Sequence, residues 1–317
     1  MAVIAKLQAP KPPHGKRRRL KSLAFVPTLM TLGNLVCGFA AIHFALRAVY
    51  ELGAHPTNDA PLAMPGTPWE LMLPSFLSIG AGLVILGLVL DGLDGLLARV
   101  TRSTTDFGGQ LDSLADVVTC GVAPATLMVA FMTKQLAGEA IVPSPISAHF
   151  LGRFAWVSAA VFVAFTAIRL ARYNVEHAKA DFDYKTFRGL PTPGAAVVIV
   201  ALIIFQDQSI GATARAVIVY AMPFVALLSA YLMVTRIPYK RFHRAYLLGR
   251  RPFEHFVGFV AIFAIFWLYR APTLLLLVFL YWLSGPVGLV VSRLRHKQPT
   301  TAASADDDAA EAERLRA

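Results

Sequence analysis

The chain has 317 residues, of which 56% are hydrophobic and only 15% are charged, and its formal net charge is +11. A soluble domain of this length needs more polar residues to cover its surface, so the composition excludes an ordinary soluble protein. The two cysteines, Cys37 and Cys120, lie in apolar runs. Their positions favour buried thiols over a disulfide framework or a zinc site.

Apolar stretches of about 20 residues recur along the chain and predict an all-α, polytopic helical membrane protein. We expect about eight transmembrane helices. Their predicted ranges are 25–47, 72–97, 110–133, 151–173, 193–207, 213–234, 254–270 and 272–292. Aromatic residues near several helix ends are interpreted as belts at the membrane interface. These residues are Trp156, Trp267, Tyr281 and Trp282.

The basic residues indicate how these helices are oriented. With the N-terminus in the cytoplasm, 25 Lys and Arg fall on the inner side and 5 on the outer side. Basic loops stay in the cytoplasm, so this asymmetry favours an even number of helices with both termini cytoplasmic. We therefore expect a multi-pass protein of the cell's inner membrane.

The two ends of the chain differ in composition from the middle. Residues 1–22 are rich in Pro, Lys and Arg and predict a disordered basic segment that contacts acidic lipid headgroups. Residues 23–297 form the predicted membrane domain, and 298–317 a disordered polar tail. No aromatic and basic recognition module accompanies the positive charge, so nucleic acid is not an expected partner.

Four aspartates stand close together in the second and third predicted helices: Asp91, Asp94, Asp112 and Asp116. A carboxylate within hydrocarbon is costly, so ionisable residues at this depth are functional candidates. The members of each pair are three or four residues apart and share a helix face. Such clustered carboxylates are typical of sites for hard divalent cations, and we expect Mg²⁺ or Mn²⁺. The competing interpretations are helix caps and the ion relay of a transporter.

The residues around the aspartates suit a phosphate-bearing ligand. Gly95, Ala98 and Gly108 are small and allow close approach to the backbone. Arg99 follows at the cytoplasmic edge, where a guanidinium group can bind phosphate oxygens.

Read together, the pattern Asp91-x2-Asp94-Gly95-x2-Ala98-Arg99-x8-Gly108-x3-Asp112-x3-Asp116 resembles the signature of the CDP-alcohol phosphatidyltransferases at every position. It fixes eight residues over 26 positions, so the match is specific. The resemblance implies a helical membrane enzyme, often dimeric, with an active site open to the cytoplasm. It also implies a metal-dependent reaction in which an alcohol displaces CMP from a CDP-linked lipid.

The same resemblance implies roles for individual residues. Asp91, Asp94 and Asp112 would hold one metal ion, and Asp112 and Asp116 a second. Asp116 would also be the general base. The residues that would bind the CDP part of the substrate are Gly95, Ala98, Arg99 and Gly108, with Thr31 and Asn34 of the first helix. These last two lie one turn apart, and hydrogen bonding to a neighbouring helix explains them equally well.

Three further segments, 27–38, 169–174 and 187–193, resemble the phosphatidylserine synthase branch of that family. This implies CDP-diacylglycerol as the lipid substrate and L-serine as the acceptor. A serine carboxylate needs a cationic partner, and several suitable groups lie on the predicted cytoplasmic side. The candidate acceptor residues are Arg169, Arg172, Asn174, Arg188 and Thr192. An ordinary role as positive-inside anchors competes for each arginine.

Two other functions stay open at this point. A sister transferase would use glycerol phosphate, inositol or inositol phosphate, and a phosphorylated acceptor would need a denser cationic pocket. An ion-coupled transporter would form no CMP and would respond in a graded way to Asp→Asn changes.

Overall fold

The computed structural model describes residues 25–54, 73–101, 106–139, 141–177, 187–207, 211–235, 237–239 and 270–296. These residues are almost entirely helical, so the prediction of an all-α fold is confirmed. The helices are α1 (Phe25–Ala54), α2 (Phe76–Thr101), α3 (Asp106–Asp116), η1 (Val117–Val122), α4 (Ala123–Gln135), η2 (Ala137–Glu139), α5 (Phe150–His177), α6 (Thr192–Gln206), α7 (Ala212–Val234) and α10 (Arg270–His296).

Within the described residues, five helical stretches are long and apolar enough to cross a membrane, which indicates a multi-pass membrane protein. They are Val26–Leu52, Phe76–Leu97, Phe107–Gln135, Phe150–Glu176 and Ala212–Val234. The predicted spans at 193–207 and 272–292 correspond to shorter apolar helices, Thr192–Gln206 and Pro272–Gly288. The predicted span at 254–270 lies outside the described residues, as do the terminal segments 1–22 and 298–317. The predicted count of eight is therefore not confirmed.

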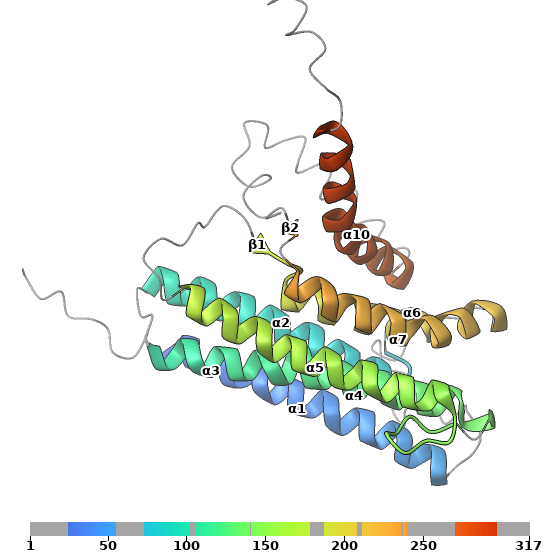
Figure 1. The fold of residues 1–317 in the computed structure, drawn as a ribbon. Coiled ribbons are helices and arrows are strands. Elements are labelled where there is room, and N and C mark those ends of the chain that lie inside the picture. Colours follow the sequence, from blue (N-terminus) through green and yellow to red (C-terminus); the bar gives the residue numbers. More distant parts are fainter. Residues whose placement is uncertain are drawn as a thin grey trace, which may run out of the picture.

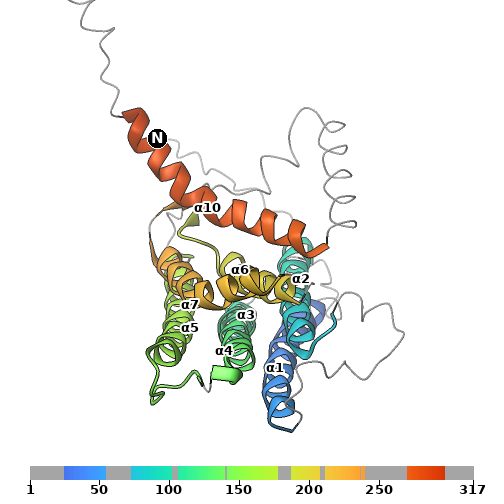
Figure 2. The same ribbon diagram turned by 90° about the vertical axis from the view of Figure 1, so that its right-hand side faces the viewer.

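The third span lies at the centre of the bundle. It consists of α3, a stretch of π-helix (η1) and α4, and two-thirds of its most apolar window is buried, against one third for α1 or α2. The helices α1 and α2 pack together on one side, and α5 and α7 on the other (Figures 1 and 2). Helix α6 contacts both α2 and α7. Large side chains such as Phe131, Phe162 and Met222 are fully buried between these helices.

Helix α10 lies across the bundle and packs against α6 (Figure 2). Its Trp282 is 95% buried, and the indole Nε1 donates a hydrogen bond to Ser229 Oγ of α7 at 3.0 Å. Tyr281 packs against the same core. The interpretation of these two residues as an interface belt is therefore wrong, because other helices surround their rings.

Two short strands, β1 (Phe187–Arg188) and β2 (Pro238–Tyr239), pair in antiparallel fashion, which the sequence did not predict. Next to them, the amide of Leu190 donates to the Leu232 carbonyl at 2.9 Å. These bonds hold the start of α6 against the end of α7. The start of α6 is thus fixed close to α5, the helix that carries Arg169, Arg172 and Asn174.

Candidate functional site

Three of the four aspartates converge on one point. Asp91 of α2 and Asp112 and Asp116 of α3 each place one carboxylate oxygen within 4.8 Å of the other two. Asp116 is buried, and the other two are partly buried. Only residues 102–105 separate α2 from α3, so the ends of these helices adjoin and their acidic faces meet. The prediction that the two pairs come together is correct for these three residues.

Asp94 lies beside this trio but has a partner of its own. It is buried, and its Oδ2 accepts a hydrogen bond from Thr31 Oγ1 of α1 at 2.7 Å. The Thr31 hydroxyl is therefore a link between α1 and α2. Its contact with a nucleotide, and Asp94 as a metal ligand, stay predictions.

Asn34, one turn further along α1, holds the catalytic candidate Asp116. Its Nδ2 donates to Asp116 Oδ1 at 3.2 Å, and its backbone carbonyl accepts from Thr119 Oγ1 at 2.9 Å. Thr119 belongs to η1, the stretch of π-helix that directly follows Asp116. Wide turns of this kind occur often at functional sites. The sequence analysis missed Thr119, because a threonine in an apolar run carries no signal of its own.

Close helix contact makes this arrangement possible. A Cβ atom on Gly87 of α2 would lie 2.7 Å from Thr119 Cγ2 and 2.8 Å from Asn34 Oδ1. Both distances are shorter than van der Waals contact, so only glycine fits here.

We therefore expect Gly87→Ala to displace Asn34 and, through it, Asp116. The predicted result is a fall in turnover of about tenfold or more, since catalytic groups tolerate little misplacement. Gly82→Ala on the same helix is the matched control, because its Cβ would meet only the flexible end of Leu73. Turnover of both purified variants is measured at saturating substrates. Equal rates for the two variants would contradict the positioning role of Asn34.

A buried cation lies next to the aspartates. Arg169 of α5 is 92% buried and is close enough to Asp116 for the opposite charges to interact. Its Nη1 donates to the hydroxyl of Thr192, the first residue of α6. Its Nε is buried and has no hydrogen-bond partner among the described residues. A buried donor of this kind is costly unless a ligand satisfies it.

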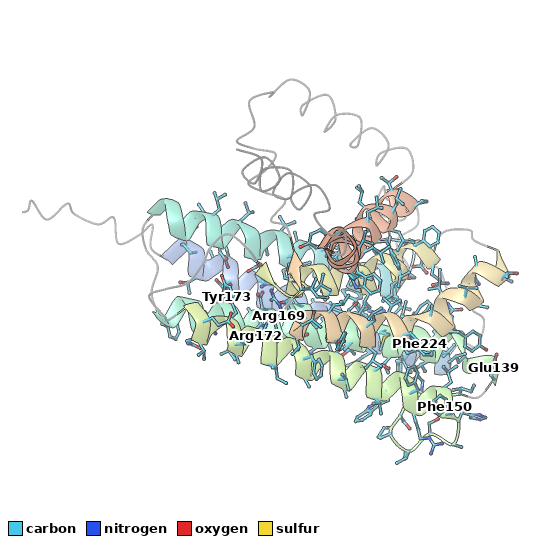
Figure 3. All side chains as sticks on the ribbon, turned by 45° about the horizontal axis from the view of Figure 1, so that its top comes forward. Glu139, Phe150, Arg169, Arg172, Tyr173 and Phe224 are labelled. Carbon is cyan, nitrogen blue, oxygen red and sulfur yellow. The ribbon has the colours of Figure 1, made fainter. Side chains whose placement is uncertain are left out.

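The other candidate acceptor residues lie near the same end of α5. Figure 3 places Arg172 and Tyr173 beside Arg169 and far from Phe150, where the helix begins. Arg172 Nη1 donates to the Val234 carbonyl at 3.0 Å. Asn174 Nδ2 donates to Ser113 Oγ of α3 at 2.8 Å. These bonds hold α5 to α7 and α3, whereas the Arg169 bond joins α5 to the start of α6.

The remaining candidates for the CDP part occupy the ends of α2 and α3. Gly95 and Gly108 are partly buried backbone positions on either side of the aspartates. The side chains of Ala98, Arg99 and Arg188 fall outside the described part of the structure. Their predicted contacts with phosphate or acceptor stay predictions.

The trio suits a hard divalent cation. Its donors are all carboxylate oxygens, the set that Mg²⁺ and Mn²⁺ prefer over soft ligands. Asp112 Oδ1 is buried and accepts no hydrogen bond from any residue that the structure describes. A cation would satisfy that oxygen and offset the repulsion between three neighbouring negative charges.

Comparison with known proteins agrees with this geometry. The chain is similar to proteins named CDP-diacylglycerol–serine O-phosphatidyltransferase. The relative from Helicobacter pylori is 35% identical over 162 residues, which cover 51% of this chain and 60% of the relative. The relative from Methanocaldococcus jannaschii is 36% identical over 118 residues, which cover 37% of this chain and 47% of the relative. The relative from Bacillus subtilis is 27% identical over 220 residues, which cover 69% of this chain and 92% of the relative.

The matches to the two Helicobacter pylori relatives span 60% and 46% of their lengths. The model of one family, CDP-alcohol phosphatidyltransferase, matches residues 24–227. This range runs from the start of α1 into α7 and includes every residue of the aspartate trio, together with Arg169 and Thr192. The chain belongs to the CDP-alcohol phosphatidyltransferase family.

Proposed function

We propose that this protein transfers a phosphatidyl group from CDP-diacylglycerol to L-serine, forming phosphatidylserine and releasing CMP. The observation that carries the proposal is the carboxylate trio of Asp91, Asp112 and Asp116 with the buried Arg169 beside it. One site of this kind offers cation ligands for a diphosphate and a positive charge for an amino acid carboxylate. The names of the relatives support the same substrates.

Asp116 is the proposed general base. Asn34 holds its Oδ1, which orients the carboxylate toward the other two aspartates. In the proposed step, Asp116 takes the proton from the serine hydroxyl as that oxygen attacks the phosphorus next to diacylglycerol. The new bond joins the serine oxygen to phosphorus, and the bond to the CMP phosphate oxygen breaks. CMP leaves with that electron pair, and no covalent enzyme intermediate forms.

Asp91, Asp112 and Asp116 are the residues that would hold a divalent cation, with Asp94 as a further proposed ligand. When bound, Mg²⁺ or Mn²⁺ would neutralise the diphosphate oxygens and stabilise the charge of the departing CMP. The residues proposed to line the CDP part are Gly95, Ala98, Arg99, Gly108, Thr31 and Asn34. Small side chains at the ends of α2 and α3 would let the nucleotide approach the backbone.

The proposed site faces the cytoplasm, and both termini lie on that side of the inner membrane. The excess of Lys and Arg at the ends of α2 and α5 supports this orientation. We also propose a homodimer, on the family resemblance. The mass of the purified protein in detergent or nanodiscs measures this state.

The proposed acceptor is tested by assaying purified full-length protein with CDP-diacylglycerol and Mg²⁺ or Mn²⁺. Serine, glycerol phosphate, inositol and inositol phosphate are supplied in turn. We expect CMP release and a phosphatidylserine product with serine alone. CMP release with another alcohol, but not with serine, would replace the acceptor and keep the reaction class.

Arg169 is the residue that we expect to bind the serine carboxylate. Arg169→Gln is predicted to raise the KM for serine on the order of 100-fold, because a buried charged contact is lost. The KM for CDP-diacylglycerol should change far less. Arg47→Gln is the control. Arg47 is an exposed cation in the C-terminal half of α1, whereas the α1 residues that bond the aspartates, Thr31 and Asn34, lie near its N-terminal end. Equal rises in both KM values for Arg169→Gln would rule out a specific acceptor contact.

A further inference from the structure

Helix α10 brings a side chain to the acceptor end of the proposed site. It lies beyond residues 24–227, the part that the family model matches, so its role is not covered by the family comparison. The helix is held against α7 by the hydrogen bond from Trp282 to Ser229 and against α6 by direct packing. This fixes the position of the neighbouring residue, Tyr281.

The ring of Tyr281 lies over the start of α6. A Cβ on Gly194 would be 3.0 Å from Tyr281 Cε1, so the ring is in close contact with the bare backbone of this glycine. Gly194 is two residues after Thr192, whose hydroxyl accepts the hydrogen bond from Arg169. The Tyr281 phenol is also close enough to the Arg169 guanidinium for the two to interact electrostatically.

We infer that Tyr281 is a specificity-determining residue of the acceptor site, where its ring forms the wall beside Arg169 and limits the size of the acceptor. This inference rests on the proposed function. The Nε of Arg169 is buried, has no hydrogen-bond partner within the described part of the chain, and can donate to an acceptor carboxylate. An amino acid bound there has its side chain next to the Tyr281 ring, so an additional methyl group on the reacting carbon meets that ring.

The test uses full-length protein with L-serine and L-threonine, which differ by one methyl group on the hydroxyl-bearing carbon. For Tyr281→Ala, we expect the ratio of kcat/KM for serine to that for threonine to fall about tenfold, the usual size of one-methyl discrimination. Tyr281→Phe keeps the wall and should keep this ratio while raising the KM for serine. Leu280→Ala, on the exposed side of the same helix, is the matched control.

A variant on α6 tests the same wall independently. Gly194→Ala should push the Tyr281 ring aside and lower the ratio in the wild-type background. In the Tyr281→Ala background, Gly194→Ala should have no further effect on this ratio, because the contact between residue 194 and the tyrosine ring is then absent. A purely structural role would lower the rates with both acceptors together and leave their ratio unchanged.

The outcomes separate this inference from the proposed function. Suppose that the protein makes phosphatidylserine but the serine-to-threonine ratio of kcat/KM is unchanged in both Tyr281→Ala and Gly194→Ala. This result overturns the role of Tyr281 and leaves the proposed function intact. Wild-type protein that releases no CMP with serine overturns the proposed function. If Tyr281→Ala does not fold, Gly194→Ala decides the question, and a ratio for Gly194→Ala equal to that of the wild-type protein refutes the wall.

Discussion

Replacing Asp116 with asparagine is expected to lower the rate of CMP release by about 10³-fold, the usual contribution of a positioned general base together with the charge it supplies. The asparagine side chain has nearly the same shape, so the protein should keep its fold. The amide cannot take a proton from the acceptor, and it is a poorer cation ligand than a carboxylate. The rate is measured with purified protein at saturating CDP-diacylglycerol, serine and Mg²⁺.

Glu139→Gln is the matched control for Asp116→Asn. It removes one negative charge from an exposed position at the far end of α4 (Figure 3) and should leave the rate unchanged.

Asp91→Asn and Asp112→Asn should be as damaging as Asp116→Asn, since all three oxygens surround one point. If all three variants kept a substantial fraction of the CMP-release rate, the proposed role of the aspartates would be contradicted. Uptake into sealed vesicles without CMP formation would establish the ion relay of a transporter.

Removing divalent cations is expected to abolish both activity and nucleotide binding. Without a cation, three carboxylates within 4.8 Å repel one another and also repel the diphosphate of the lipid substrate. Treatment with a chelator should therefore reduce CMP release to background, and added Mg²⁺ or Mn²⁺ should restore it. Binding of CDP, measured by calorimetry with and without the cation, gives a readout that does not depend on turnover.

The asparagine variants supply the control for this experiment. In Asp112→Asn, the cation should no longer strengthen CDP binding, because Asp112 Oδ1 is one of the oxygens available to it. Full activity of chelator-treated protein, with its metal content shown to be negligible, would contradict the proposed role of the aspartates.

The amino-acid pattern predicted that the aspartates of two helices would come together, and the structure confirms this for three of them. Asp112 and Asp116 are four residues apart and share one face of α3. Asp91 of α2 meets them because a short connection makes α2 and α3 neighbours. Arg169 was a candidate because the segment 169–174 resembles the phosphatidylserine synthase branch and because a serine carboxylate needs a cationic partner. These are local properties, which spacing along the chain records directly.

Contacts between distant helices could not be predicted in the same way. For Thr31 and Asn34 the sequence left a nucleotide contact and a hydrogen bond to a neighbouring helix open, and the structure shows that their side chains bond Asp94 and Asp116. The glycine at 87 is one of several in α2, and only its approach to Thr119 shows that a side chain cannot fit there.

By itself, the sequence determined that this is a helical membrane protein with a cluster of acidic residues in its apolar helices, because hydrophobicity and helical spacing are properties of consecutive residues. Only the tertiary structure decided which groups share the site. It showed that Asp94 accepts a hydrogen bond from Thr31, that Arg169 donates to Thr192 at the start of α6, and that Tyr281 of α10 lies over Gly194. The physical reason is that packing between helices depends on shape across hundreds of residues, and no local pattern encodes it.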